Sequence, residues 1–216
     1  PTRREHLPKR VEYAKWFVTR VNTNGVLLSR SLCEKLKEAS LDSLQITLYS
    51  HDEDIHNRLV GSTHFADTVQ GIRNALAAGL DVSVNTPLCN ANQDYENTLS
   101  FLKELGVRFV TLSGLILTGS AVETRERQLT EEELFAIVEK AKAFCDAHGM
   151  EMDFTSPGLI EREKLEALGL HVPICGACLS NMAIAPDGTV IPCQSWLKAD
   201  SGLGNLLTED WKTVWN

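Results

Sequence analysis

The stretches Leu44-Gln-Ile-Thr-Leu-Tyr-Ser50 and Asp81-Val-Ser-Val-Asn-Thr86 decide the fold class of this chain, because both have the composition of short strands. Between them, apolar residues recur at helical spacing, at Phe65, Val69, Ile72 and Leu76. Gly79 then stands where a helix would end. A strand, a helix and a second strand joined by short connections predict a right-handed crossover unit with parallel strands.

The same alternation continues on both sides of this unit. Further strands are predicted over residues 16–23, 107–112 and 151–155. Helices are predicted over residues 31–39, 99–105, 130–148 and 161–168, and the long one opens with the capping-box sequence Thr130-Glu-Glu-Glu133. We therefore predict an α/β protein whose parallel sheet is either open or curled into a barrel.

The most specific chemical signal is Cys175-Gly-Ala-Cys178, followed by a third cysteine at Cys193. Two cysteines separated by two residues can ligate one metal centre. The intervening segment has two apolar-rich runs around Pro186-Asp-Gly188, a turn sequence that predicts a hairpin returning Cys193 to the pair. From residue chemistry alone, an iron–sulfur cluster, a zinc ion and unmetallated thiols all stay open.

Composition excludes several classes of protein. The chain has 216 residues and a net charge of −8, with no Lys/Arg cluster interleaved with aromatic residues, which argues against a nucleic-acid binder. No apolar run approaches the roughly 18–20 residues of a membrane span, and the polar start is not a signal peptide. The isolated cysteines Cys33, Cys89 and Cys145 are unlike a disulfide framework, so we expect them to be buried and the protein to be cytoplasmic.

Polar residues follow four of the predicted strands, at Thr23-Asn24-Gly25, Ser50-His51-Asp52, Asn85-Thr86-Pro87 and Ser113-Gly114. Parallel sheets bind ligands at the carboxyl ends of their strands, so these segments predict a site for a polar ligand. No phosphate-binding glycine loop, nucleophile elbow or zinc-protease motif is present. The catalytic residues are unknown at this stage.

Taken in order, these segments resemble the radical S-adenosylmethionine enzymes. The resemblance rests on Thr23-Asn24-Gly25, Leu48-Tyr49-Ser50, Ile55-His56-Asn57, Gly61 to Phe65, Asn85-Thr86-Pro87 and Asn92. Cys175 to Cys193, with Leu203-Gly-Asn-Leu206 and Trp211 after it, is similar to the auxiliary-cluster extension called SPASM, or to its shorter form, twitch. The resemblance implies a partial (β/α) barrel over residues 1–156 and the start of a small cysteine-rich hairpin domain over residues 157–216.

The family's Cys-x-x-x-Cys-x-x-Cys loop and its Gly-Gly-Glu motif are absent from this sequence. Because the first clear strand matches the family's third, we expect an N-terminal portion that carries the catalytic [4Fe–4S] cluster to be missing. Such a fragment would be inactive alone. A protein that has lost these motifs in evolution would look the same.

The family resemblance implies a maturase that generates a 5′-deoxyadenosyl radical and modifies a peptide or protein. Thr23, Asn24 and Ser50 would hydrogen-bond S-adenosylmethionine. Asn85 and Thr86 would line its pocket. An auxiliary [4Fe–4S] cluster would be ligated by Cys175, Cys178 and Cys193, with its fourth ligand undetermined.

Two alternatives stay open. One is a small-molecule radical enzyme resembling the molybdenum-cofactor cyclases, and the other is a non-catalytic metal-binding or electron-transfer module. The expected partners are a peptide or small-molecule substrate and a reductant such as flavodoxin or ferredoxin. Neither a membrane nor a nucleic acid is expected as a partner.

Overall fold

The computed structural model describes residues 2, 5–116, 126–196 and 202–215. They form two compact units: the first from residues 1–115 and 127–172, and the second from residues 116–126 and 173–216. The division after Val172 lies later than the predicted one after residue 156, because Ile160, Leu165 and Leu170 are buried in the core of the first unit.

The first unit is built on a five-stranded sheet in which each strand runs parallel to its neighbours, in the order β1-β2-β3-β4-β5. The strands are β1 (Arg20–Thr23), β2 (Ser43–Thr47), β3 (Val82–Leu88), β4 (Phe109–Gly114) and β5 (Glu151–Phe154). This confirms the predicted α/β class. The strand predicted from Trp16 begins only at Arg20, since Trp16, Phe17 and Val18 are 75–90% exposed and lie outside the sheet.

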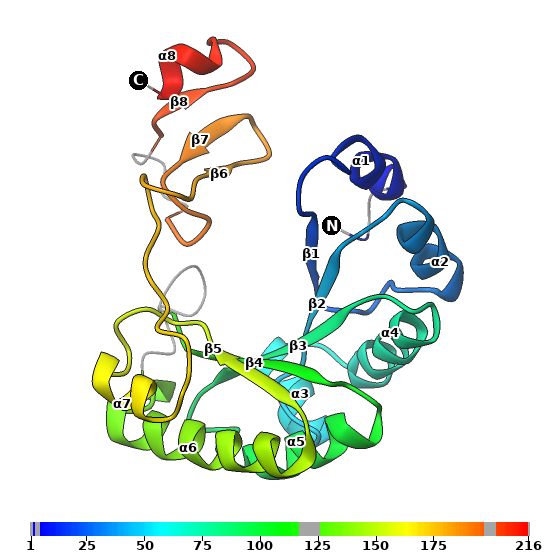
Figure 1. The fold of residues 1–216 in the computed structure, drawn as a ribbon. Helices are drawn as coiled ribbons and strands as arrows, with labels where there is room; N and C mark the ends of the chain where they lie inside the picture. Colours follow the sequence, from blue (N-terminus) through cyan, green and yellow to red (C-terminus); the bar gives the residue numbers. More distant parts are fainter. Residues whose placement is uncertain (1, 3–4, 117–125, 197–201, 216) are drawn as a thin grey trace. The chain divides into compact units, whose positions relative to one another are not determined.

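Helices lie before, between and after the strands of this sheet. They are α1 (Leu7–Tyr13), α2 (Arg30–Glu38), α3 (Glu53–Val60), α4 (Phe65–Ala77), α5 (Tyr95–Glu104), α6 (Glu131–His148) and α7 (Arg162–Ala167). Figure 1 shows α2, α4, α5 and α6 along the outer side of the curved sheet. In the described part of the chain, no helix is both long and apolar enough to cross a lipid bilayer.

The ends of two helices show how local sequence sets these elements. The predicted capping box is present at α6, where the Thr130 side chain accepts the Glu133 N–H and the Glu133 side chain accepts the Thr130 N–H. The sequence did not predict helix α3, which begins in the polar run around Asp52. Asp52 is in fact its N-cap, accepting the Ile55 N–H, and Gly61 ends the helix at a φ of +65°.

The two faces of the sheet differ in chemistry. Because side chains alternate along a strand, the buried apolar residues all point to one face, under the helices; they include Val21, Leu44, Ile46, Val84, Val110, Leu112 and Phe154. Burial of each such side chain stabilises the fold by about 1.5–3 kcal/mol. The opposite, inner face carries polar residues from the same strands: Asn22, Gln45, Thr47, Asn85, Thr111 and Ser113. The core therefore lies on the helix side, and a polar face is left for a ligand.

The second unit contains a three-stranded antiparallel sheet of β6 (Ala183–Ile184), β7 (Thr189–Ile191) and β8 (Gly204–Asn205), followed by α8 (Trp211–Trp215). Strands β6 and β7 form the predicted hairpin. Its turn contains Gly188 at a φ of +87°, and the Asp187 carboxylate accepts the Thr189 N–H at 3.0 Å. The turn residues and the apolar runs on either side of them thus form the hairpin that the sequence predicted.

Candidate ligand site at the strand ends

A row of hydrogen bonds crosses the inner face of the sheet from β2 to β4. Gln45 Nε2 donates to Thr111 Oγ1 at 2.9 Å, and the Thr111 hydroxyl donates to Asn85 Oδ1 at 2.9 Å. Asn85 Nδ2 in turn donates to Ser113 Oγ at 3.4 Å. These bonds orient the half-buried Asn85 on the face where the sequence placed a ligand. Gln45 and Thr111 were not singled out, although polar residues at alternate strand positions were a usable signal.

Thr86 lies on the other face of the sheet. Its side chain is fully buried, and its hydroxyl donates to the Leu48 carbonyl oxygen at 2.8 Å. Neighbouring residues of a strand point to opposite faces, so Asn85 and Thr86 cannot both line one pocket through their side chains. This corrects the expectation for Thr86. Its observed contact ties β3 to the residue that follows β2.

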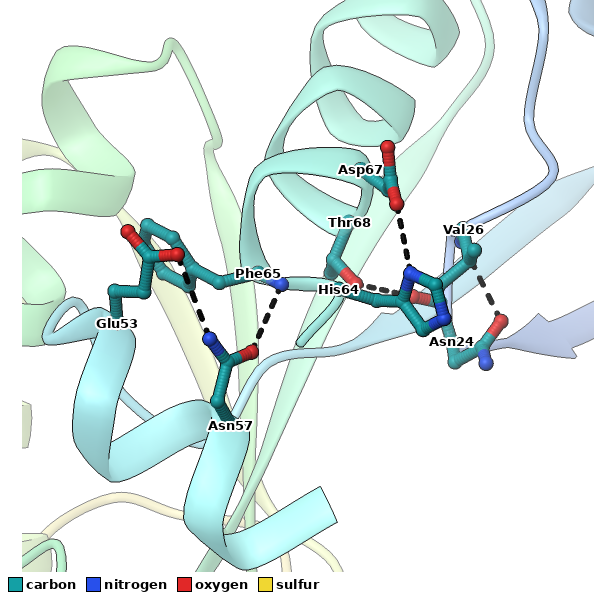
Figure 2. A network of polar contacts seen from close by, with 8 residues as sticks. All are labelled: Asn24, Val26, Glu53, Asn57, His64, Phe65, Asp67 and Thr68. Atoms are coloured by element: carbon teal, nitrogen blue, oxygen red, sulfur yellow. Dashed lines mark hydrogen bonds and ion pairs between the residues drawn. The ribbon is translucent and has the colours of Figure 1, made fainter. Parts of the chain in front are cut away.

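The segment after β1 carries the predicted residues Thr23 and Asn24. Thr23 is buried, and its hydroxyl oxygen accepts the Gly25 N–H at 3.2 Å. Asn24 is exposed, its Oδ1 accepts the Val26 N–H at 3.4 Å, and its carbonyl accepts the Thr68 hydroxyl at 2.9 Å (Figure 2). The Asn24 amide is therefore the accessible donor of this segment, whereas Thr23 shapes the turn.

Helix α4 holds this segment along one of its faces. A Cβ atom on Gly71 would lie 2.2 Å from the Gly25 carbonyl oxygen, so the two backbones touch. One turn on, Asn74 Nδ2 donates to the Leu28 carbonyl at 2.7 Å. With Thr68, these residues recur every three positions, which places them on one helical face. The position of Asn24 is thus set by a rigid helix.

Helix α3 is joined to the start of α4 by Asn57 (Figure 2). Asn57 Oδ1 accepts the Phe65 N–H at 3.0 Å, and its Nδ2 donates to a Glu53 carboxylate oxygen at 3.4 Å. His64 and Asp67 form an ion pair at 2.8 Å in the same corner, but both side chains are about half exposed, so the pair adds little stability. Asn57 therefore links the two helices in this corner by a hydrogen bond.

The ends of β2 and β3 are joined by a buried asparagine. Asn92 Nδ2 donates to the Tyr49 carbonyl at 2.7 Å and to the Pro87 carbonyl at 3.0 Å, while its Oδ1 accepts the Cys89 N–H at 2.8 Å. Ser50, which directly follows Tyr49, is only 3% exposed. The strand-end segments that carry Ser50 and Asn85 are thus held together by one side chain.

Replacing Asn92 by alanine is expected to lower the free energy of unfolding by about 2–4 kcal/mol, because three buried backbone groups would lose their partner. Urea unfolding monitored by circular dichroism measures this change. Asn97→Ala serves as the control, since that exposed amide bonds only to the Asp94 carboxylate at 2.7 Å and should change stability by no more than about 0.5 kcal/mol. Equal stability of the two variants would show that Asn92 does not hold the ends of β2 and β3 together.

The cysteines of the second unit lie in its first loop and after its hairpin. Cys175 and Cys178 are exposed and Cys193 is half-buried. Cys178 has a φ of +58°, unusual for a residue with a side chain, and its N–H donates to the Asn181 carbonyl at 3.1 Å. Ala183 pairs with Ile191, the last residue of β7, and Cys193 follows two residues later. The hairpin therefore returns the chain toward the cysteine loop.

The donor set suits an iron–sulfur cluster. All three are free thiols, and the Ser195 N–H donates to Cys193 Sγ at 3.2 Å, a contact commonly made to ligating sulfur. Among the residues described, however, no three His, Cys, Asp or Glu side chains come together closely enough to hold a metal ion. The chemistry of the residues fits, and the ligand set stays a prediction.

The remaining cysteines behave as core residues, as expected. Cys33, Cys89 and Cys145 are buried. Burial raises the pKa of the Cys33 and Cys145 thiols to about 11, so both stay protonated at neutral pH. They are poor candidates for metal ligands.

Family models match both units. Residues 2–102 match the Radical SAM superfamily, and residues 175–216 match SPASM, described as an iron-sulfur cluster-binding domain. The chain is thus similar to the radical SAM superfamily over almost half of its length. The strand-end site lies largely within the first match, and all three candidate cluster cysteines lie within the second.

Curated relatives of this chain include two cyclases. It is 34% identical over 108 residues to a probable GTP 3',8-cyclase of Sulfurisphaera tokodaii, covering 49% of this chain and 34% of the relative. It is 24% identical over 191 residues to a PqqA peptide cyclase of Ruegeria pomeroyi, covering 86% of this chain and 50% of the relative. The chain thus spans half or less of the length of these relatives.

Solved structures share the fold. Streptococcus suis SuiB bound to precursor peptide SuiA matches with a TM-score of 0.79 and 16% identity, covering 100% of this chain and 52% of SuiB. The anSMEcpe structure with bound AdoMet matches with a TM-score of 0.66 and 15% identity, covering 91% of this chain and 54% of that one. At these identities the likeness establishes the fold.

Proposed function

We propose that this chain is part of a radical S-adenosylmethionine maturase that modifies a peptide or protein and carries an auxiliary [4Fe–4S] cluster. The observation that carries the proposal is the succession of a Radical SAM match and a SPASM match in one chain. The match to the PqqA peptide cyclase covers 86% of the chain, against 49% for the GTP cyclase, which favours a peptide over a small molecule.

The strand-end residues fit the cofactor. Bound S-adenosylmethionine supplies, on reduction, a 5′-deoxyadenosyl radical that abstracts a hydrogen atom from the substrate. The exposed Asn24 amide and the Ser50 hydroxyl would donate hydrogen bonds to its methionine or ribose part. Asn85, oriented by Thr111, would line the pocket, and the apolar core behind the sheet keeps water away from that side. Thr23 would contribute indirectly, by stabilising the turn that carries Asn24.

A catalytic cluster requires ligands that these 216 residues do not supply, since they contain no Cys-x-x-x-Cys-x-x-Cys sequence. The relatives are about twice as long as the matched region, which supports catalytic cysteines outside this sequence. We propose that a flavodoxin or ferredoxin delivers the electron. A reducing compartment such as the cytoplasm suits the six free cysteines.

The auxiliary cluster would be held by Cys175, Cys178 and Cys193 as thiolates. Three ligands complete three of the four iron sites of such a cluster. The fourth iron would take a further ligand or stay open to substrate. To hold a cluster, the sulfurs of Cys175 and Cys178 and that of Cys193 would have to come closer together than they are in this structure.

The test is cleavage of S-adenosylmethionine by the whole enzyme, reconstituted anaerobically with iron and sulfide and reduced with dithionite. We expect 5′-deoxyadenosine, detected by mass spectrometry, and a smaller yield from an Asn24→Ala, Ser50→Ala double variant. Enzyme that contains its clusters but forms no 5′-deoxyadenosine would contradict the proposal and favour a non-catalytic module. Stimulation of 5′-deoxyadenosine formation by GTP would favour the small-molecule class.

A further inference from the structure

His56, in α3, is buried next to the segment that carries Ser50. Its side chain is 2% exposed, and its Nδ1 accepts the Tyr49 N–H at 3.2 Å. The ring packs edge-on against Tyr49, with centroids 6.2 Å apart, and against Phe65, with centroids 5.6 Å apart. Neither the proposed cofactor contacts nor simple core packing requires a hydrogen-bond acceptor at this position.

The Tyr49 peptide is held from both sides. His56 accepts its N–H, and Asn92 donates to its carbonyl oxygen at 2.7 Å. On the other side of Ser50, the His51 N–H donates to Thr98 Oγ1 at 3.2 Å. Ser50 is therefore flanked by backbone that α3, α5 and the segment after β3 all restrain.

The Ser50 hydroxyl is oriented in turn. Its oxygen accepts the Asp52 N–H at 3.0 Å. The side chains and backbone that the structure describes offer its hydrogen no acceptor. A hydroxyl in this state can donate one hydrogen bond to a ligand without breaking an existing bond.

We propose that His56 is a positioning residue for the cofactor site: by accepting the Tyr49 N–H, it fixes Ser50 so that its hydroxyl donates to bound S-adenosylmethionine. This inference rests on the proposed function. It assigns a role to His56, one residue of the Ile55-His56-Asn57 segment on which the family resemblance partly rests.

A neutral imidazole suits this position for two reasons. It offers a lone pair on Nδ1 to the Tyr49 N–H, and its ring fills the space between Tyr49 and Phe65. Burial lowers the pKa of His56, so the acceptor is retained at neutral pH. A leucine would fill the space but leave the N–H unpaired. An asparagine would offer Oδ1 near the position of Nδ1 but leave a cavity.

These two substitutions separate positioning from packing. In the whole enzyme with reconstituted clusters, His56→Leu is expected to weaken S-adenosylmethionine binding by about two- to tenfold, the range for one lost hydrogen bond. His56→Asn should bind more tightly than His56→Leu although its cavity makes it the less stable protein. Equilibrium dialysis measures the affinity, and amide hydrogen exchange of the Tyr49 peptide reports the lost acceptor directly.

Asn57→Ala is the matched control. It removes the acceptor for the Phe65 N–H from the adjacent residue of the same helix, but it does not contact the segment around Ser50. Its affinity for S-adenosylmethionine should equal that of the wild type.

Three results would overturn the inference. His56→Leu could bind as the wild type does, or affinity could follow stability, with His56→Asn the weakest binder; either result removes the positioning role and leaves the proposed function intact. Wild-type enzyme that does not bind S-adenosylmethionine would overturn the proposed function, and this inference with it.

Discussion

Cys178→Ala is expected to abolish the iron–sulfur chromophore that the chain forms when it is reconstituted anaerobically with iron and sulfide. Cys175, Cys178 and Cys193 are the only cysteines in the sequence of the second unit, so removal of one leaves two thiolates, too few to hold a [4Fe–4S] cluster. The absorbance at about 400 nm and the iron content per chain should both fall to background.

Two further variants show whether the thiol or the backbone is responsible. Cys178 has a φ of +58°, a conformation that glycine adopts without strain, so Cys178→Gly preserves the loop but not the ligand. It should be as colourless as Cys178→Ala. Cys33→Ala, which removes a buried thiol of the first unit, should keep the chromophore. A wild-type protein that stays colourless and binds one zinc ion would refute the cluster assignment.

Gly71→Ala is expected to lower the free energy of unfolding by about 2–3 kcal/mol, the upper part of the range for overpacking. In an ordinary helix interior the same change stabilises by about 1 kcal/mol. The sign reverses here because the new Cβ would lie 2.2 Å from the Gly25 carbonyl oxygen, a backbone atom that cannot rotate away. Urea unfolding of the chain measures the effect.

Arg73→Ala is a suitable control on the same helix. Arg73 is exposed, and its loss should change stability by no more than about 0.5 kcal/mol. If Gly71→Ala proved stabilising instead, α4 would not pack against the segment after β1 as the structure shows, and the placement of Asn24 would have to be revised.

Local patterns predicted most of the elements. Apolar residues at alternate or helical spacing marked β2, β3 and α4, because burial on one face of a strand or helix requires that spacing. The hairpin of the second unit followed from Pro186-Asp-Gly188, since the turn depends only on neighbouring residues. The same reasoning overextended β1 to Trp16, because β-propensity does not reveal whether a neighbouring strand pairs with the segment.

The candidate site was predicted in outline only. Asn24, Ser50 and Asn85 follow strands, and their common edge follows from parallel connectivity. The residues that hold them could not be found in this way. Asn92 contacts Tyr49 across 43 positions, and Thr98 contacts His51 across 47, and no local periodicity links residues so far apart.

By itself, the sequence therefore determined the order of strands and helices, the polar strand ends and the three candidate cluster cysteines. Only the tertiary structure decided that Thr86 faces the core beside Leu48 while Asn85 faces the polar side of the sheet. It also decided that His56 accepts the Tyr49 N–H. The physical reason is that periodicity depends on near neighbours, whereas a buried hydrogen bond depends on which distant backbone group the fold brings within reach of the side chain.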